Sequence, residues 1–168
     1  PIIFDIQKPP TPLLRRIPFL RGDIRSSNDL RRAFLLYAPT CVIHLAAKTD
    51  ITLSQSGLWS VNVVGSKNVL TAMRIYKCHH IVFASSAAVY GNATIPVSEK
   101  APTHPISTYG QSKEVFEGIL RDFATKKSAV FADILRLFNV AGSDEKTPFS
   151  PDVRRMTLLT NAARSVKT

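Results

Sequence analysis

Strand-length apolar runs alternate with helical patterns along this chain, and that rhythm constrains the fold more than any other feature. The apolar runs predict strands over 1–6, 17–24, 41–47, 80–86 and 129–138. Apolar residues three and four apart predict helices over 28–37, 58–76 and 107–127, and Ser150 with Pro151 predicts the start of another. Alternating strands and helices form parallel βαβ units, so the sequence predicts an α/β, doubly wound parallel sheet.

Composition narrows the class of protein. The chain has 168 residues, 45% of them hydrophobic, which is enough for one core. No apolar run approaches the roughly 20 residues of a membrane span, and the first ten residues lack the pattern of a signal peptide. These features predict a soluble, cytoplasmic protein. Cys41 and Cys78 have no metal-binding spacing and are expected to be buried thiols, and no metal site is predicted.

A formal net charge of +10 is compatible with nucleic acid, an anionic surface or a polyanionic small ligand. The basic residues occur in short groups such as "LLRR", "KKSA" and "VRRM", without the aromatic interleaving of an RNA-binding motif. Their distribution favours solvated faces and attraction of a phosphorylated ligand, and no nucleic-acid partner is predicted.

Polar residues lie at the carboxyl ends of the predicted strands, at the edge where ligands bind in parallel sheets. Acid, hydroxyl and amide groups occupy these positions: Asp5, Asp23, Ser85, Ser86 and Asn139. A further pair, Tyr109 and Lys113, lies four residues apart at the start of a predicted helix. That spacing puts a phenol and an ammonium on one helical face, where both can act on one substrate atom.

Seven motifs occur in order: "FDIQ", "RGDIR", "VIHLAA", "NVVGSKNVL", "FASSAAVYG", "YGQSK" and "LRLFNVAG". Together they resemble the extended short-chain dehydrogenase/reductases of the NAD-dependent epimerase/dehydratase family, and most resemble nucleotide-sugar epimerases of the UDP-glucose 4-epimerase type. The resemblance implies a Rossmann-like NAD-binding domain over 1–149 and the start of a substrate domain over 150–168. It also implies NAD as cofactor, a nucleotide-sugar substrate and a homodimer in the full-length form.

The resemblance implies a role for each matching residue. Ser86, Tyr109 and Lys113 would be catalytic, with Tyr109 as acid/base, and Lys113 would also anchor the cofactor ribose. Ser86 and Asn139 would contact the sugar nucleotide. The cofactor would be bound by Asp5 at the adenine ribose, and by Asp23, Ile24, Leu45, Ala46, Ala47 and Asn62, together with Tyr109 and Lys113.

The chemistry of the pair agrees with those roles. A free tyrosine has a pKa near ~10, and a nearby ammonium and a positively charged nicotinamide both favour its phenolate. Tyr109 would then remove a hydroxyl proton as hydride leaves the same carbon. Each assignment has a structural alternative, such as a wet tyrosine at the edge of the core or an asparagine that only bonds backbone.

Departures from the family pattern restrict the prediction. Ala87 and Ala88 stand where dehydratases carry an acidic pair, which disfavours dehydration, and Leu137 replaces a common aromatic. No GxxGxxG precedes the first predicted strand, so we expect an incomplete sheet that lacks its first strand and helix, with a gap between the strands of Asp5 and His44. The chain would then be inactive alone and would bind NAD weakly.

Three functions stay open at this point. A nucleotide-sugar 4-epimerase is the leading prediction. A reductase or decarboxylase of the same family would use the same Tyr109 and Lys113 pair. A non-catalytic, basic relative of the NAD-binding fold that binds RNA or protein is the third.

Overall fold

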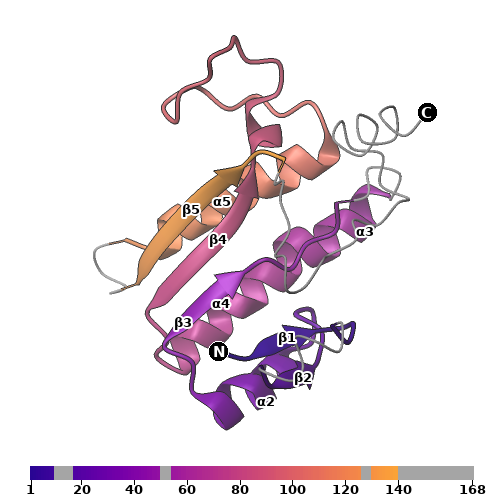
Figure 1. Cartoon of the computed structure of the whole chain (residues 1–168), viewed down its shortest axis with the longest axis vertical. Coiled ribbons are helices and arrows are strands. Elements are labelled where there is room, and N and C mark those ends of the chain that lie inside the picture. The colour runs from indigo at the N-terminus through magenta and orange to yellow at the C-terminus, as the bar shows by residue number, and fades with distance from the viewer. Residues whose placement is uncertain (10–16, 50–53, 126–129, 140–168) are drawn as a thin grey trace, which may run out of the picture. The chain divides into compact units, whose positions relative to one another are not determined.

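The computed structural model describes residues 1–9, 17–49, 54–125 and 130–139 (Figure 1). The chain divides into two compact units between Phe138 and Asn139, and the helices and strands of the described residues all belong to the first unit. The predicted domain boundary at 149/150 and the helix predicted from Ser150 lie outside the described residues.

The described strands form two parallel sheets. The first pairs β1 (Ile3–Asp5) with β2 (Phe19–Arg21), and the second has the order β3 (Cys41–His44), β4 (His80–Ser86) and β5 (Phe131–Leu137). No ladder within the described residues joins the two sheets. The prediction of a parallel α/β sheet interrupted between the strands of Asp5 and His44 is therefore confirmed.

Strand lengths follow from pairing, which the sequence pattern does not show. The strand predicted over 80–86 is confirmed with the same bounds, as β4. Both of its sides are paired for most of that length. The strand predicted over 17–24 is wrong in extent: β2 has three residues, and Gly22 begins a turn in which its amide still bonds the Asp5 carbonyl at 3.0 Å. The strand predicted over 41–47 ends at His44.

Helix α2 (Ser27–Tyr37) begins one residue before the predicted range of 28–37 and ends where that range ends. The Ser26 hydroxyl accepts a hydrogen bond from the Asp29 amide at 3.2 Å, so Ser26 is the N-cap. Leu30, Ala33 and Phe34 are buried, and the Phe34 ring stacks on Tyr76 at 5.6 Å. This stacking joins α2 to the long helix that follows β3.

The helix predicted over 58–76 consists of three consecutive segments. These are α3 (Gln55–Trp59), the π-helical segment η1 (Ser60–Gly65) and α4 (Ser66–Ile75). A π-helical turn is wider than an α-helical one and is often found at functional sites. Gly65 lies in η1, and a Cβ there would come within 2.7 Å of the Ile24 side chain. Glycine thus allows the helix to pass close to the turn after β2.

Helix α5 (Thr108–Phe123) lies against the second sheet. The Ser107 hydroxyl accepts from the Gly110 amide at 3.0 Å and caps the helix. Phe116 and Leu120 are fully buried, and the rings of Phe83 and Phe116 meet edge to face at 4.7 Å. The helix ends at Phe123, so its predicted extension towards 127 is wrong for the described residues.

Helices α4 and α5 lie on the same face of the second sheet (Figure 1). Along β4, Ile81, Phe83 and Ser85 alternate as buried residues on that face. The helices do not cover Ile43 and Leu45, which are 68% and 67% exposed. Cys41 is also exposed, contrary to the prediction, whereas Cys78 is buried as expected.

Membrane spans and metal clusters are both absent from the described residues. No helix there combines the length and apolarity needed to cross a bilayer. Nor do three or more His, Cys, Asp or Glu side chains gather there as metal ligands would.

Candidate active site

The end of β4 meets the first two turns of α5, and this junction brings Ser86, Tyr109 and Lys113 together. Lys113 is only 3% exposed, and its Nζ donates to the Ala84 carbonyl at 2.8 Å. The same Nζ lies 4.7 Å from the centre of the Phe83 ring and 5.8 Å from that of the Tyr109 ring. An ammonium therefore sits between the strand and the phenol, as the spacing of the two residues predicts.

Burial controls the titration of both residues. It lowers the pKa of Lys113 to about 8. It also raises the pKa of Tyr109, and a hydrogen bond with Ser86 opposes that rise only in part. Removing the phenolate from water therefore outweighs the hydrogen bond with Ser86 in setting the pKa of Tyr109. The effect expected from Lys113 and a charged nicotinamide stays a prediction.

Ser86 is the last residue of β4 and begins the short 3₁₀ helix η2 (Ala87–Tyr90). Its Oγ accepts from the Ala88 amide at 3.2 Å. The helix start at Gly110 packs closely on this turn, since a Cβ at Gly110 would lie 2.6 Å from the Ala88 carbonyl oxygen. The tight contact holds Tyr109 beside Ser86.

Next to the junction is His44, which is buried and uncharged. Its Nε2 lies 2.7 Å from Ser66 Oγ, and its ring packs at 5.7 Å from both Phe83 and Phe116. Burial lowers the pKa of His44 to about 4, and the charge of Lys113 contributes in the same direction. A neutral imidazole is consistent with a structural role in the core.

Asn62, predicted to contact the cofactor, is 2% exposed and bonds protein groups. Its Oδ1 accepts from the Lys48 amide at 2.8 Å. Its Nδ2 donates to the Lys48 carbonyl at 2.9 Å and to Ser112 Oγ at 3.0 Å. Both amide hydrogens are thus used, so the side chain holds the segment after β3 against α5.

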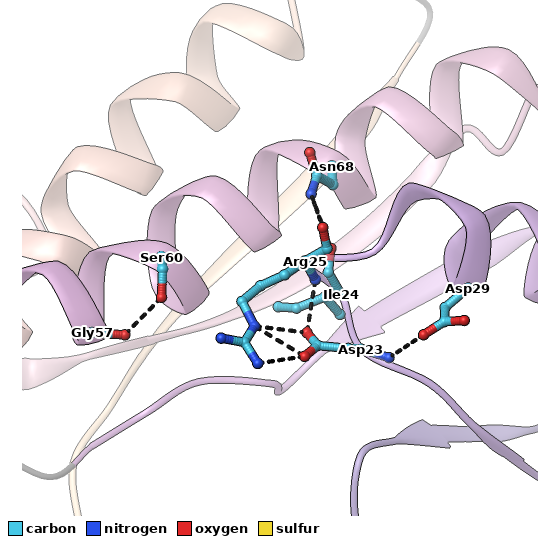
Figure 2. A network of polar contacts seen from close by, with 7 residues as sticks. All are labelled: Asp23, Ile24, Arg25, Asp29, Gly57, Ser60 and Asn68. Carbon is cyan, nitrogen blue, oxygen red and sulfur yellow. Dashed lines mark hydrogen bonds and ion pairs between the residues drawn. The ribbon is translucent and has the colours of Figure 1, made fainter.

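The predicted adenine site lies in the turn between β2 and α2 (Figure 2). The Asp23 carboxylate accepts from the Arg25 amide at 2.8 Å and from its guanidinium at 2.6–3.1 Å. Asp29 accepts from the Asp23 amide at 3.0 Å, and Asn68 Nδ2 donates to the carbonyls of Ile24 and Arg25. The turn is thereby anchored to α4.

The other predicted cofactor residues lie at strand ends. Asp5 is exposed at the end of β1, and its Oδ1 accepts from the Gln7 amide at 2.8 Å. Leu45, Ala46 and Ala47 follow β3, with Leu45 exposed and both alanines half-buried. Asn139 begins the second unit and is exposed.

Sequence reasoning missed a buried polar cluster formed by Ser85, Glu117 and Arg136. Glu117 is completely buried and bonds both of the other side chains. One signal was available: a glutamate continues the four-residue spacing of Tyr109 and Lys113 and so shares their helical face. Its partners on β4 and β5 are too distant in sequence for that spacing to identify them.

The donors present fit NAD at the junction better than at the adenine turn. An ammonium has three hydrogens, and Lys113 places its nitrogen near the phenol of Tyr109 while bonding Ala84, which suits the ribose hydroxyls of a nicotinamide nucleotide. Asp5 is an exposed acceptor at the end of its strand, as a ribose contact requires. Asp23 bonds Arg25, so adenine would meet the turn through other atoms.

Residues 5–167 match the NAD dependent epimerase/dehydratase family. The chain belongs to this family. The family is enzymatic, its cofactor is NAD, and its members include the UDP-glucose 4-epimerases. A UDP-glucose 4-epimerase from Oryza sativa is 31% identical over 146 residues, 84% of this chain and 39% of that protein. The bifunctional protein GAL10 of Pachysolen tannophilus is 36% identical over 137 residues, 77% of this chain and 20% of that protein.

Solved structures agree with the family. UDP-glucose 4-epimerase from Brucella ovis, in complex with NAD, superposes with a TM-score of 0.84 at 28% identity, covering 95% of this chain and 50% of that one. The enzyme from Thermus thermophilus, also with NAD, gives 0.67 at 32% identity, covering 76% of this chain and 42% of that one. The chain thus spans half or less of the length of these relatives and has the Rossmann-like α/β fold of the solved ones.

Proposed function

We propose that the protein is an NAD-dependent nucleotide-sugar 4-epimerase of the UDP-glucose/UDP-galactose type. The observation that carries the proposal is the junction of β4 and α5, where Tyr109, Lys113 and Ser86 meet in a chain of this family. Several similar structures are UDP-glucose 4-epimerases determined with NAD, and one also with UDP.

Tyr109 serves as the acid/base of the reaction. It takes the proton from the sugar hydroxyl and later returns one, while Ser86 hydrogen-bonds the reacting oxygen. Bound NAD would supply a reversible hydride acceptor for the same carbon, so no net oxidation would result. Burial raises the pKa of Tyr109, and positive charge close to the ring would favour its phenolate. Lys113 provides one such charge.

The remaining predicted residues bind the ligands. Asp5 bonds the adenine ribose, and Asp23 with Ile24 borders the adenine. Leu45, Ala46 and Ala47 lie beneath the dinucleotide, and Asn139 contacts the sugar nucleotide. Asn62 acts on the cofactor through the segment at Lys48, since both of its amide hydrogens bond protein atoms. The homodimer, the cytoplasmic location and a domain boundary at 149/150 remain predictions.

Replacing Tyr109 with phenylalanine tests the proposal. In a full-length form of the protein, we expect Tyr109→Phe to lower kcat for UDP-galactose by about three orders of magnitude while the Kd for NAD stays within about threefold, because only the proton carrier is removed. Tyr37→Phe, at an exposed position on α2, is the matched control and should leave both unchanged.

The assay also separates the epimerase from its alternatives. An epimerase turns over with catalytic NAD, whereas a reductase consumes NADH or NADPH in proportion to product. Turnover of Tyr109→Phe within a few-fold of the parent would contradict the assigned role. Stoichiometric consumption of reduced cofactor would contradict the epimerase.

A further inference from the structure

Glu117 is a fully buried carboxylate that takes no part in the proposed proton transfer. Ser85 Oγ donates to its Oε1 at 2.5 Å. Arg136 approaches with two nitrogens, Nη2 to Oε2 at 2.8 Å and Nε to Oε1 at 3.0 Å. Arg121 donates to Oε2 at 2.6 Å from the next turn of the same helix. A buried charge with this many partners has a specific structural or functional task.

The position of Glu117 on its helix suggests that task. Tyr109, Lys113 and Glu117 are spaced four residues apart, so they form a row on one face of α5. Two of them bond consecutive residues at the end of β4, Lys113 to Ala84 and Glu117 to Ser85. Tyr109 lies near enough to the next residue, Ser86, for that side chain to lower its pKa. Glu117 therefore forms the third contact between this helix face and the strand that carries Ser86.

Arg136 extends the contact to the neighbouring strand and to the loop after η2. It pairs directly with Ser85 in the register of β4 and β5. Its guanidinium lies 4.8 Å from the Tyr90 ring, and Nη1 donates to the Glu99 carbonyl at 3.3 Å. Through one arginine, the carboxylate is linked to the end of β5, to η2 and to the following loop.

The charges in the cluster of Ser85, Glu117 and Arg136 compensate one another. Burial raises the pKa of Glu117, but hydrogen bonds from Arg136, Ser85 and Arg121 outweigh it and keep the carboxylate ionised. A buried ion pair contributes little net stability compared with apolar packing, because desolvation cancels much of the attraction. The pair does provide a defined geometry. The two bonds from Arg136 and the bond from Ser85 can form together only when α5, β4 and β5 are correctly aligned.

We propose that Glu117 is a positioning residue which, through Ser85 and Arg136, sets the alignment of α5 on β4 and so holds Tyr109 and Lys113 in register with Ser86. The inference rests on the proposed function, because it concerns the same reaction. Acid/base chemistry of this kind requires reacting atoms about 3–3.5 Å apart, and misplacement of about 1 Å can lower the rate by about 10²-fold.

The test removes only the Ser85 hydroxyl from the cluster. Ser85→Ala deletes one bond to Glu117 and leaves both arginines in place, so the variant should fold. We expect kcat to fall about tenfold with KM within twofold, because binding groups are untouched while their alignment is loosened. Arg121→Ala is the matched control: it removes a bond to the same carboxylate, made within α5 by a side chain that is 54% exposed. It should leave kcat and KM within twofold.

A second readout does not require turnover. In crystal structures of the variants, the Lys113 Nζ to Ala84 carbonyl distance should lengthen beyond 2.8 Å in Ser85→Ala and stay unchanged in Arg121→Ala. An inactive full-length parent protein would refute the proposed function but not the positioning role, which the structures would still test. Unchanged kcat and unchanged distances in Ser85→Ala would overturn the positioning role. An equal loss of kcat in Arg121→Ala would do the same.

Discussion

Two carboxylate–guanidinium pairs in this protein use the same chemistry in different surroundings. Asp23 and Arg25 are two residues apart in one turn, and their side chains are 27% and 49% exposed. Glu117 and Arg136 are 19 residues apart and join a helix to a strand, with exposures of 0% and 17%. The local pair shapes a turn, whereas the distant pair aligns two elements of the candidate active site.

The difference shows what burial adds to an ion pair. A hydrogen bond from Arg25 lowers the pKa of Asp23 in an accessible turn, where water can replace the arginine. Water cannot replace Arg136 beside a carboxylate that has no exposed surface. No buried side-chain nitrogen or oxygen in the part of the chain that the structure describes lacks a hydrogen-bond partner. Loss of one partner in the buried pair should therefore be costly.

The largest expected effect comes from neutralising the buried member. Glu117→Gln keeps the size of the side chain but leaves Arg136 without its counter-charge. We therefore expect the free energy of unfolding to fall by about 3 kcal/mol. Asp23→Asn is the matched change in the exposed pair and should move the unfolding midpoint by no more than about 2 °C. Urea and thermal unfolding followed by circular dichroism measure both. Similar losses in the two variants would remove the distinction between the pairs.

A second prediction concerns the buried ammonium and its dependence on pH. The pKa of Lys113 is lowered from 10.5 to about 8, so the unfolded chain binds the proton more tightly. The contribution of this group to the free energy of unfolding should therefore rise by about 3 kcal/mol between about pH 8 and 10.5. Below pH 8 the buried ammonium is charged, and its full destabilising effect is present. Lys113→Met should abolish that rise.

The measurement is urea unfolding from pH 7 to 10 of a Tyr109→Phe parent and of the same protein with Lys113→Met added, so that the raised pKa of Tyr109 does not enter the difference. The raised pKa of Cys78 acts in the opposite direction at high pH, but it does so in both proteins and cancels. We expect the stability of the parent relative to the variant to increase with pH. A difference that stays constant over this range would show that Lys113 is not desolvated.

The smallest expected changes in the free energy of unfolding come from replacing either of two glycines on α5 with alanine. A Cβ at Gly110 would lie 2.6 Å from the Ala88 carbonyl oxygen, whereas one at Gly118 would meet no atom within 4 Å. Gly110→Ala should destabilise the fold by about 1–2 kcal/mol, because backbone must move at the junction of α5 and η2. Gly118→Ala should stabilise it by about 0.5–1 kcal/mol through helix propensity. Equal effects of both changes, measured by urea unfolding, would mean that the junction is not tightly packed.

The sequence alone determined the features that depend on neighbouring residues. Ser26 begins α2 with a capping bond to Asp29, β4 occupies its predicted residues, and the four-residue spacing of Tyr109 and Lys113 places both at the start of α5. Cap chemistry, apolar period and helical spacing act within a few residues, so the pattern is visible in the chain itself.

Tertiary structure alone decided the features that depend on distant partners. The bonds of Asn62 to Lys48, the pairing of Glu117 with Ser85 and Arg136, and the raised pKa of Tyr109 arise only when separate elements pack. The exposure of Ile43 and Leu45 likewise depends on which face of the sheet the helices cover. Burial and long-range hydrogen bonding are properties of the packed chain, because desolvation of a group is set by whatever surrounds it in space and not by its neighbours in sequence.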